Sequence, residues 1–274
     1  MKGYKKMTKN RQILMKTRPV GMPKLENFDI IESNMPEARH GEVLIKILWL
    51  SLDPYMRGRM SKAKSYAASL NEGDLILGGA VGKVINSHTP EYKEGDIVEG
   101  FALGWQEYAI ANPASIRKIN PNLAPIQTAV GVLGMPGMTA FVGLRHIGKP
   151  IPGDTVVVSA ASGAVGQLVG QIAKIGGCHV VGIAGGKEKC DYLINTLNFD
   201  AAIDYKNENV DDMLDKYCPN GVNVYFDNVG GKIADSVINK LANYARVAVC
   251  GVISQYNLTE AESGLRTHRA MLTN

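Results

Sequence analysis

The chain changes its pattern of apolar and polar positions once, near residue 125. Before that point, short β-branched and aromatic runs are broken repeatedly by Gly, Pro and Asn, which is typical of a compact β-barrel-like domain. After it, strand-like and helix-like segments alternate, which predicts a parallel sheet with helical crossovers. We expect a disordered leader at residues 1–11, a β-rich domain over residues 12–125 and a parallel-sheet domain over residues 126–274.

Residues 155–189 predict one strand–turn–helix–strand unit. A short apolar strand is followed by the Gly-rich turn Ala160–Gly166 and then by apolar residues at helical spacing. Such a turn presents free backbone N–H groups at the positive end of a helix dipole, where a pyrophosphate can bind. Gly163 allows close approach of the phosphate and Gly166 allows close helix–strand packing, although Ala161 stands at the first glycine of the usual G-x-G-x-x-G. We favour a dinucleotide site over an ordinary tight turn, because the strand and the helix are both present.

The end of the second strand indicates which dinucleotide binds. An NAD site has Asp or Glu there, which accepts hydrogen bonds from the ribose hydroxyls. Here the strand ends in Ala184-Gly185-Gly186, and Lys187 and Lys189 follow. Small residues leave room for a 2′-phosphate, and ammonium groups can neutralise it. The alternative is that both lysines are solvated charges at the start of the next helix. Because no acid stands at the strand tip, we favour NADP over NAD.

The composition excludes several classes of protein. With 274 residues and 45% hydrophobic residues, the chain is long enough for two globular domains. A net charge of +4, from 30 basic and 26 acidic residues, is too balanced to favour nucleic acid or a membrane as a partner. No run approaches the roughly 18 continuous apolar residues of a membrane span, and the basic N-terminus lacks the apolar run of a signal peptide. We therefore expect a cytoplasmic protein.

Neither the cysteines nor the histidines are grouped as metal ligands usually are. The cysteines form no C-x-x-C pair and have no histidine at ligand spacing; they are Cys178, Cys190, Cys218 and Cys250. The histidines are equally dispersed along the chain. We expect no bound metal and no disulfide.

Several runs of residues, spread over most of the chain, resemble one family. The main ones are residues 52–60, 134–140, 160–166, 225–231 and 250–257. Together they resemble the zinc-independent, NADPH-dependent double-bond reductases of the medium-chain dehydrogenase/reductase superfamily, which include prostaglandin, plant alkenal and bacterial curcumin reductases. The resemblance implies an α/β chain with a GroES-like β-rich domain followed by a Rossmann domain. It also implies reduction of the C=C bond of α,β-unsaturated aldehydes or ketones, and commonly a homodimer.

The resemblance implies a set of residues that contact NADP(H). Lys189 and Tyr205 match contacts to the 2′-phosphate, and Asn228 matches a contact beneath the nucleotide. Thr139 resembles a contact near the nicotinamide, although a helix N-cap is an equally good interpretation. The complete set is Thr139, Ala160, Gly163, Ala164, Val165, Gly166, Gly185, Lys189, Tyr205, Asn228, Cys250, Gly251 and Ser254.

Tyr55 and Tyr256 are the candidate catalytic residues. In the resembled family, such tyrosines border the nicotinamide and the enone, where a phenol can donate a hydrogen bond to the substrate oxygen. Hydride transfer to the β-carbon generates an enolate, a donor stabilises the oxyanion, and the α-carbon then takes a proton from Tyr or water. The alternative is that both tyrosines are wall residues that only shape the pocket.

Two further features leave the function open. The family members continue beyond the point that corresponds to Asn274, so we expect a C-terminally shortened chain that lacks elements of the Rossmann sheet. A quinone oxidoreductase of the same superfamily is one alternative function, although its members usually lack the run at residues 52–57. A non-catalytic NADP-binding protein is the other.

Overall fold

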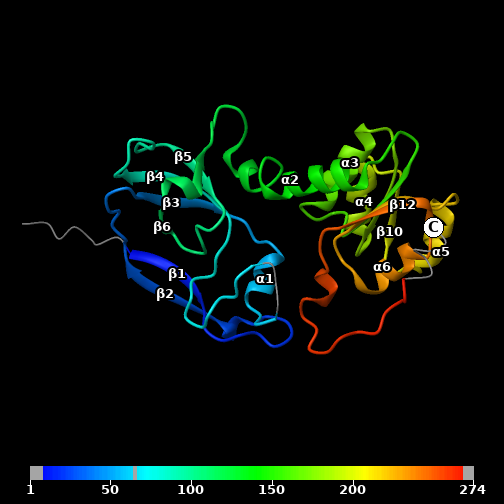
Figure 1. Cartoon of the computed structure of the whole chain (residues 1–274), viewed down its shortest axis with the longest axis horizontal. Helices are drawn as coiled ribbons and strands as arrows, with labels where there is room; N and C mark the ends of the chain where they lie inside the picture. The colour runs from blue at the N-terminus through cyan, green and yellow to red at the C-terminus, as the bar shows by residue number, and fades with distance from the viewer. Residues whose placement is uncertain (1–8, 64–66, 268–274) are drawn as a thin grey trace, which may run out of the picture. The chain divides into compact units, whose positions relative to one another are not determined.

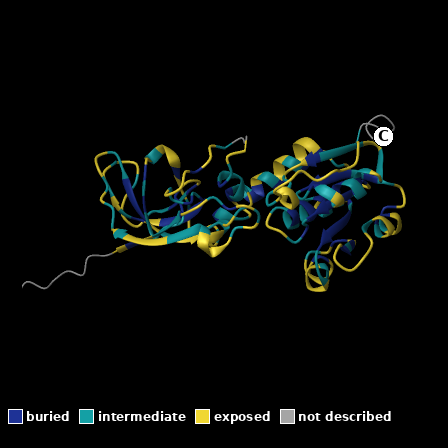
Figure 2. Ribbon diagram, turned by 90° about the horizontal axis from the view of Figure 1, so that it is seen from below, coloured by how far each residue is buried: buried dark blue, intermediate teal, exposed yellow. Residues whose placement is uncertain are grey.

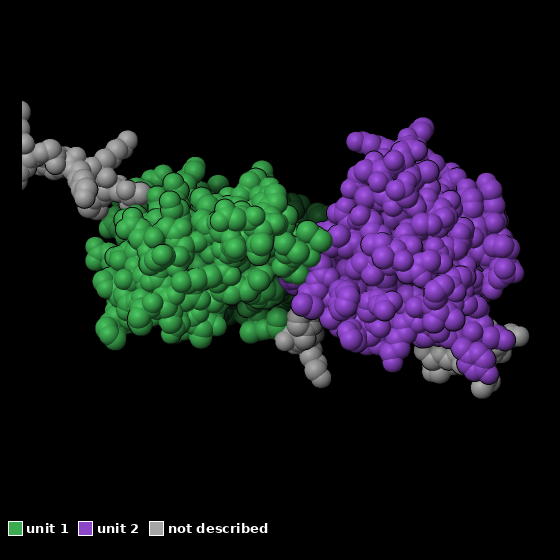
Figure 3. Space-filling view, turned by 90° about the horizontal axis from the view of Figure 1, so that it is seen from above, with its two compact units in different colours: residues 1–134 green, residues 135–274 purple. Residues whose placement is uncertain are grey.

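The computed structural model describes residues 9–63 and 67–267 and divides into two compact units, residues 1–134 and 135–274 (Figure 3). The division lies beyond residue 125, where the sequence pattern changes, because the short helix η3 (Ile126–Val130) packs against strands of the first unit. Residues 1–11 were expected to be a disordered leader, but Lys9–Arg11 form the start of strand β1 (Lys9–Met15). Residues 1–8 lie outside the described residues.

The first unit is built from antiparallel strands. A five-stranded sheet has the order β6-β3-β4-β5-β7, and β1 pairs with β2 in a separate two-stranded sheet (Figure 1). The strands are β1 (Lys9–Met15), β2 (Phe28–Asn34), β3 (Val43–Leu50), β4 (Ala80–Ser87), β5 (Ile97–Gly100), β6 (Tyr108–Ala111) and β7 (Ile116–Lys118). The helices are η1 (Leu25–Asn27), α1 (Tyr55–Arg59), η2 (Pro113–Ser115) and η3. The expected β-rich architecture is confirmed.

Buried residues of this unit follow the strands (Figure 2). Val43 and Ile45 of β3 are fully buried, together with Val84 of β4 and Val98 of β5. Strands β3 and β4 approach closely at Gly82, where a Cβ atom would lie 2.6 Å from the Lys46 carbonyl oxygen. Only glycine therefore permits this packing.

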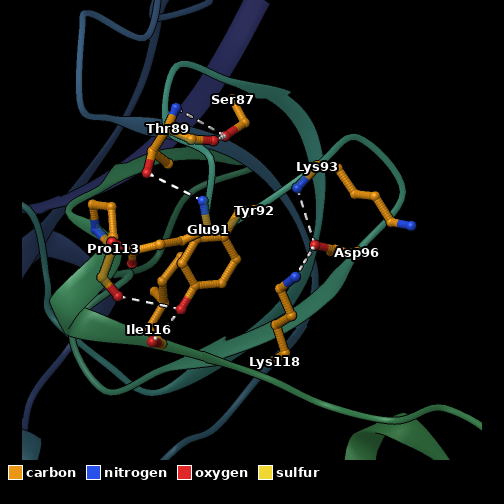
Figure 4. Close-up of polar contacts among 9 residues, drawn as sticks. All are labelled: Ser87, Thr89, Glu91, Tyr92, Lys93, Asp96, Pro113, Ile116 and Lys118. Atoms are coloured by element: carbon orange, nitrogen blue, oxygen red, sulfur yellow. Dashed lines mark hydrogen bonds and ion pairs between the residues drawn. The ribbon is translucent and has the colours of Figure 1, made fainter.

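A polar cluster fastens β7 to the loop between β4 and β5 (Figure 4). The Tyr92 hydroxyl donates hydrogen bonds to the carbonyl oxygens of Pro113 and Ile116, at 3.2 and 2.7 Å. Lys118 pairs with Asp96 at 2.9 Å, and its ammonium lies 5.4 Å from the centre of the Tyr92 ring. Because the Tyr92 hydroxyl and the Lys118–Asp96 pair connect segments of the same unit, we assign this cluster a structural role.

The second unit, which contains β10 and β12 in Figure 1, is a parallel five-stranded sheet with the order β10-β9-β8-β11-β12. The strands are β8 (Thr155–Ser159), β9 (His179–Ala184), β10 (Ala201–Asp204), β11 (Val222–Asp227) and β12 (Leu241–Val249). The helices are α2 (Met135–Val142), η4 (Gly143–Gly148), α3 (Gly166–Ile175), α4 (Lys187–Asn195), α5 (Val210–Tyr217), α6 (Gly231–Ile238) and η5 (Ile253–Gln255). This confirms the expected Rossmann-type sheet.

Successive residues of the central strands pack into two different cores. Val156 and Val158 of β8 belong to a cluster with residues of α2, α3 and α4, whereas Val157 belongs to a cluster with residues of α5 and α6. Helices therefore cover both faces of the sheet, which explains why its strands are apolar almost throughout. The chain first adds β9 and β10 on one side of β8 and then returns to add β11 and β12 on the other side. The switch point of the sheet therefore lies between the neighbouring strands β8 and β11. Open α/β sheets bind ligands at the carboxyl ends of the strands beside such a switch point.

Candidate cofactor site

The turn between β8 and α3 has the geometry of an anion site. Ala160 adopts a left-handed conformation, with φ of 47°. A Cβ atom on Gly166 would collide with the Ala160 carbonyl oxygen and lie 2.8 Å from the Ala161 Cα, so α3 begins closer to the turn than any other residue would allow. Several backbone N–H groups of the turn, namely those of Ser162, Ala164, Val165 and Gly166, donate no hydrogen bond to any residue that the structure describes. They are available to an anion at the positive end of the helix.

A cavity of about 580 Å³ lies at the carboxyl ends of these strands. It is bordered by the turns that follow β8, β9, β10 and β11, and by the segment that follows β12. Its lining residues are Ala160, Ser162, Gly163, Ala184, Gly185, Lys189, Tyr205, Val229, Gly230, Lys232, Ile233, Ile253, Ser254 and Glu262.

At one end of the cavity, a lysine without an ion-pair partner among the described residues lies close in sequence to a strand end that carries no acidic residue. Strand β9 ends in Ala184, and the Tyr205 ring packs so closely on Gly185 that a Cβ atom there would lie 2.8 Å from it. The Lys187 ammonium is paired with Asp191 at 2.6 Å, whereas Lys189 forms no ion pair within the described ranges 9–63 and 67–267. Of the two lysines named from the sequence, Lys189 is therefore the one free to neutralise a phosphate.

A buried carboxylate supports the opposite wall. Asp227 ends β11, and one of its oxygens accepts hydrogen bonds from the Ser159 and Tyr225 hydroxyls and from the N–H groups of Val229 and Gly230. The Tyr225 pKa is raised, first by burial and then by the charge of Asp227, so this phenol remains a donor. The network fixes the turn that carries Val229 and Gly230 to the cavity edge.

Asn228 lies directly above this network. Its N–H donates to the Ser159 hydroxyl at 2.9 Å, and its side-chain NH₂ donates to the Ser159 carbonyl oxygen at 2.8 Å. These contacts orient the amide and leave its carbonyl oxygen as an acceptor. Next to it, the Ser254 hydroxyl donates to the Val229 carbonyl oxygen at 2.6 Å, which ties the segment after β12 to the same wall.

Comparison with known proteins identifies the family. Two family models match: one described as the N-terminal domain of oxidoreductase, over residues 11–119, and one described as zinc-binding dehydrogenase, over residues 164–273. The chain is 44% identical to the NADPH-dependent curcumin reductase of Escherichia coli (strain K12), over 93% of this chain and 74% of that protein. It is 46% identical to the 2-alkenal reductase (NADP(+)-dependent) of Nicotiana tabacum, over 92% of this chain and 75% of that protein.

The chain belongs to the NADPH-dependent double-bond reductases of the medium-chain dehydrogenase/reductase superfamily. The fold agrees with this assignment. CurA from Vibrio vulnificus, solved in complex with NADPH, superposes with a TM-score of 0.90 at 46% identity, over 96% of this chain and 77% of that one.

The cavity fits the cofactor of this family. Its lining residues include Ser162, whose N–H is unpaired, and Lys189, which forms no ion pair among the described residues and stands beside a strand end without an acid. The other unpaired N–H groups of the turn and the oriented Asn228 amide belong to residues close in sequence to lining residues. A mononucleotide half needs no more than this from a Rossmann unit. The residues present are therefore compatible with NADPH.

Some of the expected NADP(H) contacts line the cavity and others do not. Those that line it are Ala160, Gly163, Gly185, Lys189, Tyr205 and Ser254. Ala164, Val165 and Gly166 belong to the same turn without lining the cavity, and Asn228 lies one residue before the lining residue Val229. Thr139 and Cys250 line a second cavity, of about 300 Å³, beside β12. All of these remain predicted contacts.

The structure places the two candidate catalytic tyrosines in different units. Tyr55 opens α1 in the first unit, with its ring stacked on Phe101 at 5.3 Å between ring centres. Tyr256 follows η5 in the second unit, and its hydroxyl accepts a hydrogen bond of 3.5 Å from the N–H of Val252. Gly251 packs against the same hydroxyl, because a Cβ atom there would lie 3.3 Å from it.

Several lining residues were not expected from the sequence. They are Ser162, Ala184, Val229, Gly230, Lys232, Ile233, Ile253 and Glu262. A signal for some of them was present: Gly230-Gly231 follows a strand and opens α6, so it is a second Gly-rich turn before a helix. Nothing in the sequence around Glu262 indicates that this carboxylate reaches the cavity.

Neither a grouped metal site nor a membrane-spanning helix is found among the described residues. Among the residues that the structure describes, no three His, Cys, Asp or Glu side chains are grouped as a metal site requires. Within the same residues, no helix has the length and apolar character needed to cross a membrane.

Proposed function

We propose that this protein uses NADPH to reduce the C=C bond of α,β-unsaturated aldehydes or ketones. The observation that carries the proposal is the cavity end lined by Lys189 and Tyr205: Lys189 forms no ion pair among the described residues, and the neighbouring end of β9 carries no acid. That arrangement suits a 2′-phosphate and therefore NADPH. The substrate class is supported by the activities named for the curcumin and 2-alkenal reductases, at 44% and 46% identity.

The residues of the second unit would hold the nucleotide. When bound, NADPH supplies the hydride that reduces the β-carbon of the substrate. The N–H groups at the start of α3 bind the pyrophosphate, while Lys189 and Tyr205 bind the 2′-phosphate. The Asp227 network holds the Asn228 amide in place, so this wall is ordered before the ligand arrives.

Tyr256 and Tyr55 are the proposed catalytic residues. Addition of hydride to the β-carbon moves negative charge onto the carbonyl oxygen, and a phenol O–H directed at that oxygen stabilises the charge. The resulting enolate takes a proton at its α-carbon from a tyrosine or from water. The Tyr256 hydroxyl accepts rather than donates in its contact with Val252, so its proton is available for a substrate oxygen.

The test is oxidation of NADPH in the presence of a medium-chain 2-alkenal or enone. NADH and a quinone serve as parallel controls, and the product is identified by mass spectrometry. We expect NADPH-dependent formation of the saturated carbonyl compound. Turnover with the quinone alone would instead indicate the quinone oxidoreductase alternative. Binding of NADPH without oxidation by either acceptor would indicate a non-catalytic NADP-binding protein.

Three further statements complete the proposal. A homodimer is proposed because the family is commonly dimeric, and sedimentation tests it. A cytoplasmic location is also proposed, and fractionation of cells that express the protein tests it. A metal-free mechanism is proposed from the scattered cysteines and histidines, and metal analysis of the purified protein tests it.

A further inference from the structure

Asp204, at the end of β10, connects two turns that border the cavity. Its side chain is buried, with 8% of the residue exposed. One carboxylate oxygen accepts from the N–H of Gly186 at 2.7 Å and from the N–H of Lys206 at 3.1 Å. The other oxygen accepts from the Asn207 side-chain amide at 2.7 Å. The carboxylate therefore bridges the turn after β9 and the turn after β10.

These two turns carry the proposed 2′-phosphate contacts. Gly186 caps α4, and its carbonyl oxygen accepts the N–H of Lys189 at 3.1 Å. Tyr205 directly follows Asp204, and its N–H donates to the Ala184 carbonyl oxygen at 3.1 Å. A shift of the Gly186 N–H away from Asp204 would move the first turn of α4, and Lys189 with it.

The Asp204 carboxylate is ionised and is surrounded by hydrogen-bond donors. The hydrogen bond from the Gly186 N–H, followed by that from the Asn207 side chain, holds the pKa of this carboxyl below its usual range, so it is ionised at neutral pH. The dipoles of these N–H groups offset part of the repulsion between its negative charge and a nearby phosphate. Because its oxygens are engaged by N–H donors, the carboxylate orders the site and does not compete for the ribose hydroxyls as the acid of an NAD site does.

We propose that Asp204 is a positioning residue for selectivity toward the 2′-phosphate. By holding the Gly186 and Lys206 N–H groups on one oxygen, it sets the separation of Lys189 and Tyr205. This inference rests on the proposed use of NADPH.

The test measures ligand binding rather than turnover. Adenosine 2′,5′-bisphosphate and AMP differ by the 2′-phosphate alone, and calorimetry gives the affinity of the full chain for each. Asp204→Ala removes both accepting oxygens, so the N–H groups of Gly186 and Lys206 lose the acceptor that they share. We expect its affinity for the bisphosphate to fall about tenfold, the effect of losing one or two such hydrogen bonds, with less than about a twofold change for AMP.

Asp200→Ala is the matched control. Asp200 also accepts a backbone N–H, that of Val180 at 2.6 Å, and pairs with Lys174 at 2.6 Å, but it lies at the opposite end of β10 and does not line the cavity. It should lower the unfolding temperature without changing the ratio of the two affinities. If Asp204→Ala does not fold, Asp204→Glu keeps the charge while displacing the oxygens, and the same loss of selectivity is expected.

The outcomes separate the two proposals. If the unsubstituted chain prefers the bisphosphate and the Asp204 variants keep that preference, the role of Asp204 is wrong while the use of NADPH stands. Equal losses for both ligands would also overturn it, because they would indicate a general structural effect. If the unsubstituted chain binds both ligands equally, the proposed use of NADPH fails and this inference fails with it.

Discussion

The Ser159 hydroxyl donates a hydrogen bond of 3.0 Å to the Asp227 carboxylate, and both side chains are buried where β8 and β11 end side by side. The same hydroxyl accepts the N–H of Asn228 at 2.9 Å. A single buried hydroxyl therefore connects the strand that precedes the pyrophosphate turn with the wall that carries the Asn228 amide. Strands β8 and β11 are therefore connected at the switch point by this side-chain contact as well as by their backbone hydrogen bonds.

Replacing Ser159 by Ala should destabilise the chain. The substitution leaves the N–H of Asn228 without an acceptor and removes one donor from Asp227. An unpaired buried polar group costs about 1–3 kcal/mol. Urea unfolding of the variant measures the loss, and Ser162→Ala in the neighbouring turn is the control. Equal midpoints for the variant and the unsubstituted chain would contradict this account of the Asp227 network.

Replacing Lys189 by Ala should weaken NADPH binding far more than NADH binding. A hydrogen bond to a charged group contributes about 1.5–3 kcal/mol, so a roughly 10- to 100-fold loss is expected for NADPH alone. Lys187→Ala is the matched control, because its ammonium is already paired with Asp191. Fluorescence titration gives the dissociation constants. A parallel loss for both cofactors would show that Lys189 does not contact the 2′-phosphate.

Replacing Gly185 by Ala should disturb the same end of the cavity by overpacking. The new Cβ atom would lie 2.8 Å from the Tyr205 ring and 2.9 Å from the Lys206 side chain. Both side chains are exposed and can move away, so we expect little loss of stability, but displacement of Tyr205 should weaken NADPH binding. Gly58→Ala is the control, since a Cβ atom there meets nothing within 4 Å. Unchanged affinity in the Gly185 variant would argue against Tyr205 as a contact.

Replacing Tyr256 by Phe should lower turnover without affecting cofactor binding. The variant keeps the ring and removes the proton that we assign to the substrate oxygen. Loss of one oxyanion donor commonly lowers kcat by about 10²-fold. Single-turnover kinetics with a 2-alkenal measure the step, and Tyr217→Phe, at the end of α5, is the matched control. Turnover equal to that of the unsubstituted chain would leave Tyr256 as a wall residue.

The buried thiols of Cys178 and Cys218 should react slowly with electrophiles at neutral pH. Burial raises the pKa of both, that of Cys218 to about 12. The thiolate is the reactive form, so alkylation should accelerate about tenfold for each pH unit below the pKa. Mass spectrometry after iodoacetamide treatment at several pH values tests this, with the unfolded chain as the control. Rapid labelling of Cys218 in the folded protein at pH 7 would contradict its burial.

The sequence alone determined those features that depend on residues near one another along the chain. The turn at Ala160–Gly166 and the start of α3 follow from glycines at short spacing and from the apolar strand before them. The absence of an acid at the end of β9, with Lys189 shortly after it, indicated the cofactor for the same reason. The change of pattern near residue 125 indicated two architectures, because the apolar period differs between antiparallel and parallel sheets.

Only the tertiary structure decided which distant residues share the site. Ser159 and Asp227 meet because β11 pairs with β8, and that strand order results from packing helices on both faces of the sheet. The bridge from Asp204 to Gly186 and the position of Glu262 at the cavity likewise depend on chain segments that pass one another in space. The spacing of residues along the sequence does not predict such contacts, since the same pattern of apolar and polar residues is compatible with many strand orders. The phosphate-binding turn could therefore be predicted from neighbouring residues in the sequence. The contacts that position this turn and the rest of the candidate site required the tertiary structure.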